Sequence, residues 1–97
     1  MTTTNGYYSH AEGESTNANG NYSHAEGRDT TANGNYSHAE GYYTSASGYS
    51  QHVSGKYNIA QGNPSSFVDT DYAYIIGNGT SNVLRANALT LDWLGNL

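Results

Sequence analysis

Glycine recurs every seven residues between positions 6 and 62, and this spacing is unbroken. The nine glycines are Gly6, Gly13, Gly20, Gly27, Gly34, Gly41, Gly48, Gly55 and Gly62. A small apolar residue precedes each later glycine by two positions, and these residues are Ala11, Ala18, Ala25, Ala32, Ala39, Ala46, Val53 and Ala60. A residue with a hydroxyl group lies four positions before most of these glycines. A repeat of this kind predicts stacked, nearly identical structural units.

A second period of fourteen residues overlies the first. The segment Tyr8–Gly13 reads Tyr-Ser-His-Ala-Glu-Gly and recurs as Tyr22–Gly27 and Tyr36–Gly41. The heptads between these segments have a different sequence, with Thr where the first kind has Ser. The structural unit is therefore predicted to span fourteen residues in two unlike halves.

A coiled coil also has a period of seven, but it needs two large apolar positions in each heptad, and this chain offers one Ala. Each glycine inside a helix would also cost about 1 kcal/mol relative to alanine. A short strand fits better, because a hydroxyl and an Ala two residues apart share one of its faces. We expect a glycine with positive φ to end each strand in a turn. Two strands and two turns then form one coil of a parallel solenoid, with Ser, Thr and Ala inside.

Such a core is thin. Burial of an Ala methyl contributes about 0.8 kcal/mol, whereas ordering the backbone of one residue costs roughly 1–2 kcal/mol. One Ala in seven residues cannot offset that cost, so more apolar surface must be buried against another chain. Composition alone does not give the number of chains.

The repeated Ser-His-Ala-Glu-Gly, with Ala-x-Gly at seven, resembles the head repeats of YadA-like trimeric autotransporter adhesins, in the form found in phage and prophage tail fibres. The resemblance covers residues 5–62. It implies a left-handed parallel β-roll, three of which pack side by side as a homotrimer. The fold class expected is thus all-β, with a β-roll over residues 1–63 and a C-terminal β-rich cap or connector over residues 64–97.

The segment after Pro64 loses the glycine spacing and gathers the large apolar residues. Its pattern predicts a turn at 63–66, strands at 67–68, 72–76 and 88–94, and a hairpin turn at 77–79. We expect this segment to cap the open end of the solenoid, with Phe67 and Trp93 in an apolar cluster between chains.

Two stretches of this segment, 76–81 and 85–96, are similar to parts of phage tail fibres that often precede a self-cleaving trimerisation chaperone. That chaperone is absent from this sequence. The resemblance therefore implies the part that remains after cleavage, or a truncated chain.

The outward positions of the repeat are expected to stack Tyr on Tyr, His on His and Glu on Glu. A column of glutamates would repel itself, and the His column of a neighbouring subunit would relieve that repulsion. We therefore predict that this face lies between subunits and that acid weakens the trimer by protonating Glu. The interface candidates are Tyr8, His10, Glu12, Tyr22, His24, Glu26, Tyr36, His38 and Glu40, with Phe67 and Trp93.

Ser, His and Glu in close sequence also suggest a hydrolase. A catalytic site is one arrangement on a rigid support, whereas this trio is repeated three times, and Ser9 and His10 should face opposite ways. No catalytic residue is therefore assigned, and the chain is expected not to be an enzyme.

The histidines, the acidic residues near position 70 and the remaining tyrosines are candidates for metal or sugar binding as well as for structural roles. The four His are interpreted as a structural column, although imidazole columns do bind transition ions. Asp69-Thr70-Asp71 lacks the further ligands of a calcium loop and is interpreted as a solvated turn. No metal or cofactor is predicted. The other exposed tyrosines are candidates to stack on sugars or to form ladders and interfaces, and they are Tyr7, Tyr42, Tyr43, Tyr49 and Tyr57.

Charge and composition exclude several partners. With three Lys and Arg and a net charge of −5, the chain has no basic patch for nucleic acid. It has no long apolar run to insert into a membrane, and no Cys. Its start does not resemble a signal peptide, so we expect either a fragment or release by a route that needs no such signal, of which phage lysis is one.

We expect a structural and receptor-contacting segment of a homotrimeric phage or prophage tail fibre, which attaches to a host-cell glycan or protein. Its place would be extracellular, on a virion tail or a bacterial surface. The alternative is the head of a bacterial trimeric adhesin that binds a host or matrix surface. A polysaccharide-degrading tailspike ranks third, because it needs paired carboxylates in a groove rather than a column of equivalents.

Overall fold

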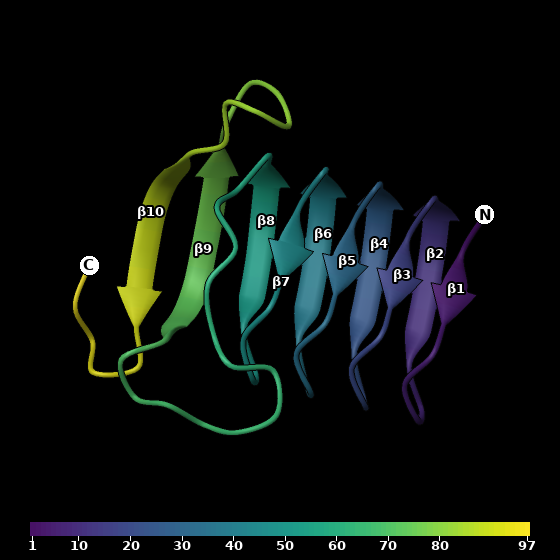
Figure 1. The fold of residues 1–97 in the computed structure, drawn as a ribbon, viewed down its shortest axis with the longest axis horizontal. Coiled ribbons are helices and arrows are strands. Elements are labelled where there is room, and N and C mark those ends of the chain that lie inside the picture. The colour runs from purple at the N-terminus through teal and green to yellow at the C-terminus, as the bar shows by residue number, and fades with distance from the viewer.

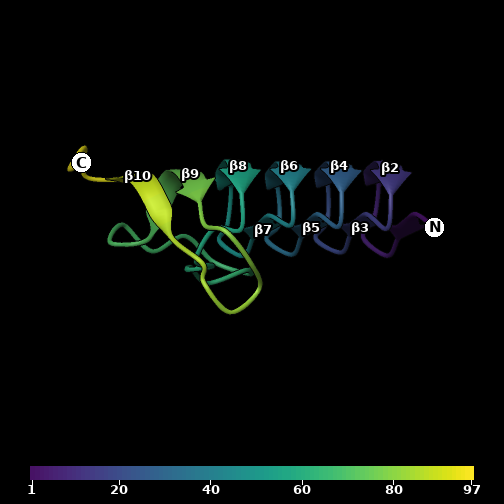
Figure 2. The same cartoon turned by 90° about the horizontal axis from the view of Figure 1, so that it is seen from above.

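The structure, a computed structural model, describes residues 1–97 and consists of strands, turns and loops without a helix. No helical segment of sufficient length and apolar character to cross a bilayer is therefore present. The strands form two sheets that face each other across a narrow interior (Figures 1 and 2).

Each coil of the solenoid contributes one short and one long strand. The short strands are β1 (Thr3–Thr4), β3 (Asn17–Ala18), β5 (Thr31–Ala32) and β7 (Ser45–Ala46). The long strands are β2 (His10–Glu14), β4 (His24–Arg28), β6 (His38–Tyr42) and β8 (His52–Lys56). Neighbouring strands are parallel and shifted by fourteen residues, so that His24 pairs with His10 and with His38. The predicted parallel solenoid with fourteen-residue coils is confirmed.

The C-terminal segment continues the sheet of long strands. Strand β9 (Tyr72–Asn78) pairs in parallel with β8, and β10 (Asn87–Asp92) returns antiparallel to β9. Figure 1 shows both strands at one end of the molecule, in line with β8. The predicted strands near 72–76 and 88–94 are confirmed.

Two local predictions in this segment are wrong. Phe67 and Val68 lie in the loop between β8 and β9, where the Oδ1 atom of Asn63 accepts hydrogen bonds from the amides of Ser65 and Ser66. Gly77 is not in a hairpin turn but inside β9, in register with Gly55 of β8. A side chain on Gly77 would overlap the backbone carbonyl of Lys56, so this glycine allows close packing within the sheet. The chain reverses later, over residues 79–86.

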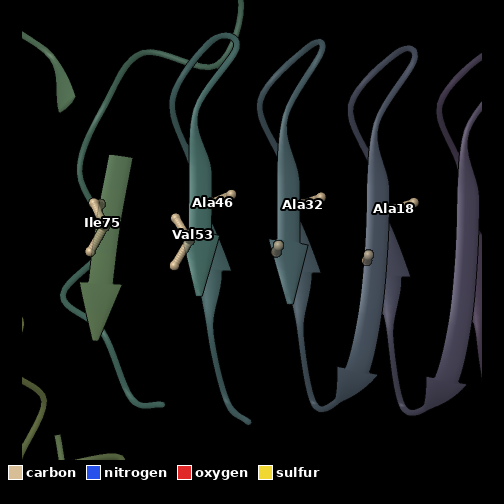
Figure 3. Packing of buried hydrophobic residues seen from close by; sticks show 7 residues of the cluster. Ala18, Ala32, Ala46, Val53 and Ile75 are labelled. Atoms are coloured by element: carbon tan, nitrogen blue, oxygen red, sulfur yellow. The ribbon is translucent and has the colours of Figure 1, made fainter. Parts of the chain in front are cut away.

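One row of fully buried apolar side chains fills the interior. Its members are Ala18, Ala25, Ala32, Ala39, Ala46, Val53 and Ile75, of which Figure 3 labels five. The side chains grow from Ala to Val53 in β8 and Ile75 in β9. Buried polar side chains fill the remaining inner positions, and these are Thr16, Ser23, Thr30, Ser37, Thr44, Gln51 and Asn58. The predicted inward face of hydroxyls and Ala is thus confirmed from Thr16 to Val53, whereas Ala11 is half-buried and Ala60 is exposed.

The glycines are needed for stacking more than for turning. A side chain on Gly20 would overlap the backbone carbonyl of Gly34, the equivalent glycine of the next coil. Gly27 lies inside β4, not at its end, with a φ of 108°. The expectation that every glycine makes a positive-φ turn is therefore wrong: Gly6, Gly20, Gly34 and Gly48 lack positive φ. Positive φ at the corners falls instead on Tyr8, Ser15, Tyr22, Asp29, Tyr36, Tyr43, Ser50 and Tyr57.

Asparagine side chains join the coils at one corner. The Nδ2 atom of Asn5 donates to Oδ1 of Asn19 at 2.7 Å, and Nδ2 of Asn19 donates to Oδ1 of Asn33 at 2.8 Å. Each amide both donates and accepts, so a column of identical residues satisfies itself. This ladder gives the stack a polar stabilisation that the thin apolar core does not provide.

Candidate functional site: the histidine–glutamate ladder

The outer face of the long-strand sheet carries one His and one Glu per coil. His is the first residue and Glu the third residue of β2, β4 and β6, so both point away from the buried Ala between them. The fourteen-residue register then stacks like on like. We call the set His10, Glu12, His24, Glu26, His38, Glu40 and His52 the histidine–glutamate ladder.

The imidazole rings of the ladder are in contact along its whole length. Ring centroids lie 4.8 Å apart between His10 and His24, 4.6 Å between His24 and His38, and 4.7 Å between His38 and His52. The ring of Tyr74 in β9 continues the column, 4.8 Å from His52. The spacing follows from the separation of neighbouring strands, about 4.8 Å.

Each Glu is paired with a His of the next coil in the same chain. The Nε2 atom of His38 lies 3.1 Å from Oε1 of Glu26, and His52 lies 3.0 Å from Glu40. His24 approaches Glu12 at 3.5 Å. Diagonal neighbours on adjacent strands are within reach of long side chains.

These pairs remove the need for a neighbouring subunit to relieve repulsion within the Glu column. The Glu column needs no His from another subunit, because its own chain supplies one for each carboxylate. Burial of this face between subunits remains a prediction, without that support.

The pairing changes the acidity of one carboxyl group. The hydrogen bond with His52 lowers the pKa of Glu40 below its usual value, and the nearby charges of His52 and His38 act in the same direction. Partial desolvation opposes this shift without reversing it. Glu40 is thus held as a carboxylate by its neighbours in the ladder.

The tyrosines of the repeat form a separate row on the turns that precede the long strands. The rings of Tyr8 and Tyr22 stack at 5.5 Å and those of Tyr22 and Tyr36 at 5.2 Å. All three are exposed, from 52% for Tyr36 to 86% for Tyr8. We call this set the tyrosine row. The predicted stacking is present, but the tyrosines stand beside the ladder rather than within the same strands.

A second aromatic cluster lies on the turns that follow the long strands, among tyrosines named above as candidates for sugar stacking, ladders or interfaces. Tyr43 and Tyr57 stack at 4.8 Å, and Tyr42 meets both edge-on. Arg85 binds the cluster to the C-terminal segment, since its Nη1 atom donates to the carbonyl of Tyr43. A hydrogen bond with Tyr42 raises the pKa of the Tyr57 hydroxyl. The signals for this cluster in the sequence are the adjacent tyrosines at 42 and 43 and the fourteen-residue spacing of Tyr43 and Tyr57.

The C-terminal apolar candidates are neighbours. Phe67 and Trp93 lie with ring centroids 5.6 Å apart, and Phe67 is 57% exposed. The loop that carries Phe67 is fixed by Asp71, whose carboxylate accepts hydrogen bonds from the Gln61 side chain and the Asn63 amide. The contact between the two rings is formed within one chain. Their burial against a second chain stays a prediction.

The serines of the repeat do not meet the histidines. The Oγ atom of Ser23 donates to the carbonyl of Gly20 inside the coil, whereas His24 lies on the outer face. The surface of the chain has no pocket. The ladder is therefore an exposed array of imidazole and carboxylate groups, with the serines of the repeat on the other face of the strands.

The fold and the ladder together define a parallel β-solenoid with two regular rows of exposed side chains. The chain matches no protein-family model, and no curated protein or solved structure matches it either.

Proposed function

We propose that this chain is a structural and receptor-contacting segment of a homotrimeric phage or prophage tail fibre that attaches to a host-cell surface. The observation that carries the proposal is the solenoid with identical coils, whose repeated Ser-His-Ala-Glu-Gly resembles tail-fibre and adhesin-head repeats. A regular shaft that presents similar side chains in successive coils suits a fibre, which must be stiff and offer many equivalent contacts.

The proposal of partner chains is supported by the apolar surface that a single chain leaves exposed to solvent. The molecule measures 35 × 30 × 16 Å, and only 19 of its 97 residues are buried. Large apolar side chains remain exposed in the C-terminal segment, including Val83, Leu84 and Leu94. Three chains and left-handed coils are part of the proposal and rest on the resemblance.

The mass in solution tests the assembly. We expect light scattering coupled to size exclusion to give about three times the chain mass of 10.4 kDa at micromolar concentration. Replacement of the exposed Leu84 and Leu94 by Ser should shift that mass toward the monomer if these side chains are covered in the trimer. The control is Ile59→Ser, which changes an exposed apolar residue outside the C-terminal segment that is not among the interface candidates. A folded wild-type monomer would contradict the homotrimer.

Cell attachment tests the function. A labelled protein is expected to bind intact bacteria or their purified surface polysaccharides, and to lose roughly tenfold or more in affinity when Tyr8, Tyr22 and Tyr36 are all changed to Ser. Aromatic rows bind sugar rings and apolar receptor surfaces through their faces. The Ile59→Ser variant is the control, because Ile59 is exposed and apolar but outside the tyrosine row.

Three outcomes distinguish the alternatives. Binding to collagen or other matrix proteins, with none to bacteria, would favour the adhesin head instead. Release of oligosaccharides from the bacterial polysaccharide would point to a tailspike. The mass in solution of the triple tyrosine variant shows whether it has lost receptor contact or assembly. Loss of assembly lowers this mass, whereas loss of receptor contact alone leaves it unchanged.

A further inference from the structure

Two groups of potential metal ligands meet in the N-terminal half of the ladder. One consists of His10, Glu12 and His24, and the other of His24, Glu26 and His38. Within each group the donor atoms of all three side chains lie within 4.8 Å of one another. Every ligand comes from one chain, so the arrangement exists whatever the number of subunits.

The separations are close to those of a coordinated ion. Tetrahedral zinc with bonds of about 2.0–2.1 Å places its ligand atoms about 3.3 Å apart. Nε2 of His24 lies 3.5 Å from Oε1 of Glu12, and Nε2 of His38 lies 3.1 Å from Oε1 of Glu26. The Nε2 atom of His10 lies 3.8 Å from Oε1 of Glu12.

His24 provides an independent indication. Its Nε2 atom is buried and has no hydrogen-bond partner, because the 3.5 Å approach to Glu12 does not make a bond. A buried nitrogen without a hydrogen-bond partner is unfavourable. A metal ion would supply the missing partner at the one residue that the two groups share.

The donor set selects the kind of ion. Two imidazole nitrogens and one carboxylate oxygen suit Zn²⁺ and similar transition ions, whereas Ca²⁺ and Mg²⁺ prefer oxygen alone. The half-exposed face leaves room for water to complete the coordination. We propose that His24, with Glu12 and His10 or with Glu26 and His38, binds one divalent transition-metal ion per chain.

The limit of one ion follows from the shared ligand. A neutral imidazole has a single lone pair at Nε2, so His24 cannot serve two ions at once. The ion therefore occupies one group or the other. Loss of His10 or of His38 should leave one complete group, whereas loss of His24 destroys both.

Isothermal titration calorimetry with ZnCl₂ tests the proposal on the full chain without a histidine tag. We expect one Zn²⁺ per chain and a loss of at least about tenfold in affinity for His24→Gln. His10→Gln and His38→Gln alone should bind one ion with less than that loss, and the double variant should match His24→Gln. His52→Gln is the control, because it is in the same column but belongs to neither group.

Circular dichroism spectra that match the wild type would show that the variants keep the solenoid. A rise in thermal stability with added Zn²⁺ in the wild type, lost in His24→Gln, provides a second measurement. Absence of Zn²⁺ binding at millimolar concentration would overturn the proposal. Equal affinity of His24→Gln and His52→Gln would do the same, since the ion would then lie elsewhere.

Discussion

Replacement of Gly27 by alanine is expected to lower the free energy of unfolding by at least about 3 kcal/mol. Gly27 lies inside β4, between Gly13 of β2 and Gly41 of β6. A methyl group there would overlap the carbonyl oxygen of Gly41, which is held in a sheet and cannot move aside without breaking hydrogen bonds. The φ of 108° adds strain, because side chains of L-residues rarely adopt it.

Gly95→Ala is the matched control for this change. Gly95 also has a positive φ, of 89°, but a methyl group on it would meet nothing within 4 Å. It should therefore cost only the backbone strain, about 1 kcal/mol. Urea denaturation followed by circular dichroism, at equal chain concentration and without metal, measures both losses. Equal losses would show that the coils are not closely stacked at Gly27.

Ile75→Ala is expected to cost about 2–5 kcal/mol and to loosen β9 and β10 from the solenoid. Ile75 is the largest fully buried side chain and is next to Val53 at the end of the apolar row (Figure 3). Without it, little apolar contact holds β9 against the coil that precedes it. Backbone hydrogens of β9 and β10 should then exchange much faster, while those of β4 and β6 remain protected.

Ile76→Ala tests whether the inward position is responsible. Ile76 is the next residue of β9, but it lies on the other face and is only half-buried. The same chemical change there should cost roughly 1 kcal/mol or less. If both variants lost the same stability, Ile75 would not be the contact that attaches the C-terminal strands.

The repeat made the architecture predictable from local information alone. Identical coils stack in register, so a spacing of fourteen between equivalent residues became the pairing of His10 with His24 and of Glu12 with Glu26. The alternation of side chains along a strand then separated inward Ala from outward His and Glu. Each of these steps depends on residues within one coil.

The site was predicted less completely, because its key contacts join different coils. His and Glu were expected to stack as separate columns, with Glu relieved by another subunit. The structure instead places His38 beside Glu26 and His52 beside Glu40, through the diagonal reach across neighbouring strands. Spacing along the chain does not reveal which way a flexible carboxylate turns.

The sequence by itself therefore determined the coil length, the parallel register and the choice of inner and outer faces, because these depend on a period repeated in every coil. Only the tertiary structure decided where positive φ falls, which glycines stack without turning, how the loop with Phe67 runs and which His meets which Glu. Those features depend on contacts between segments that come together only on folding. The spacing of residues along the sequence does not determine such contacts.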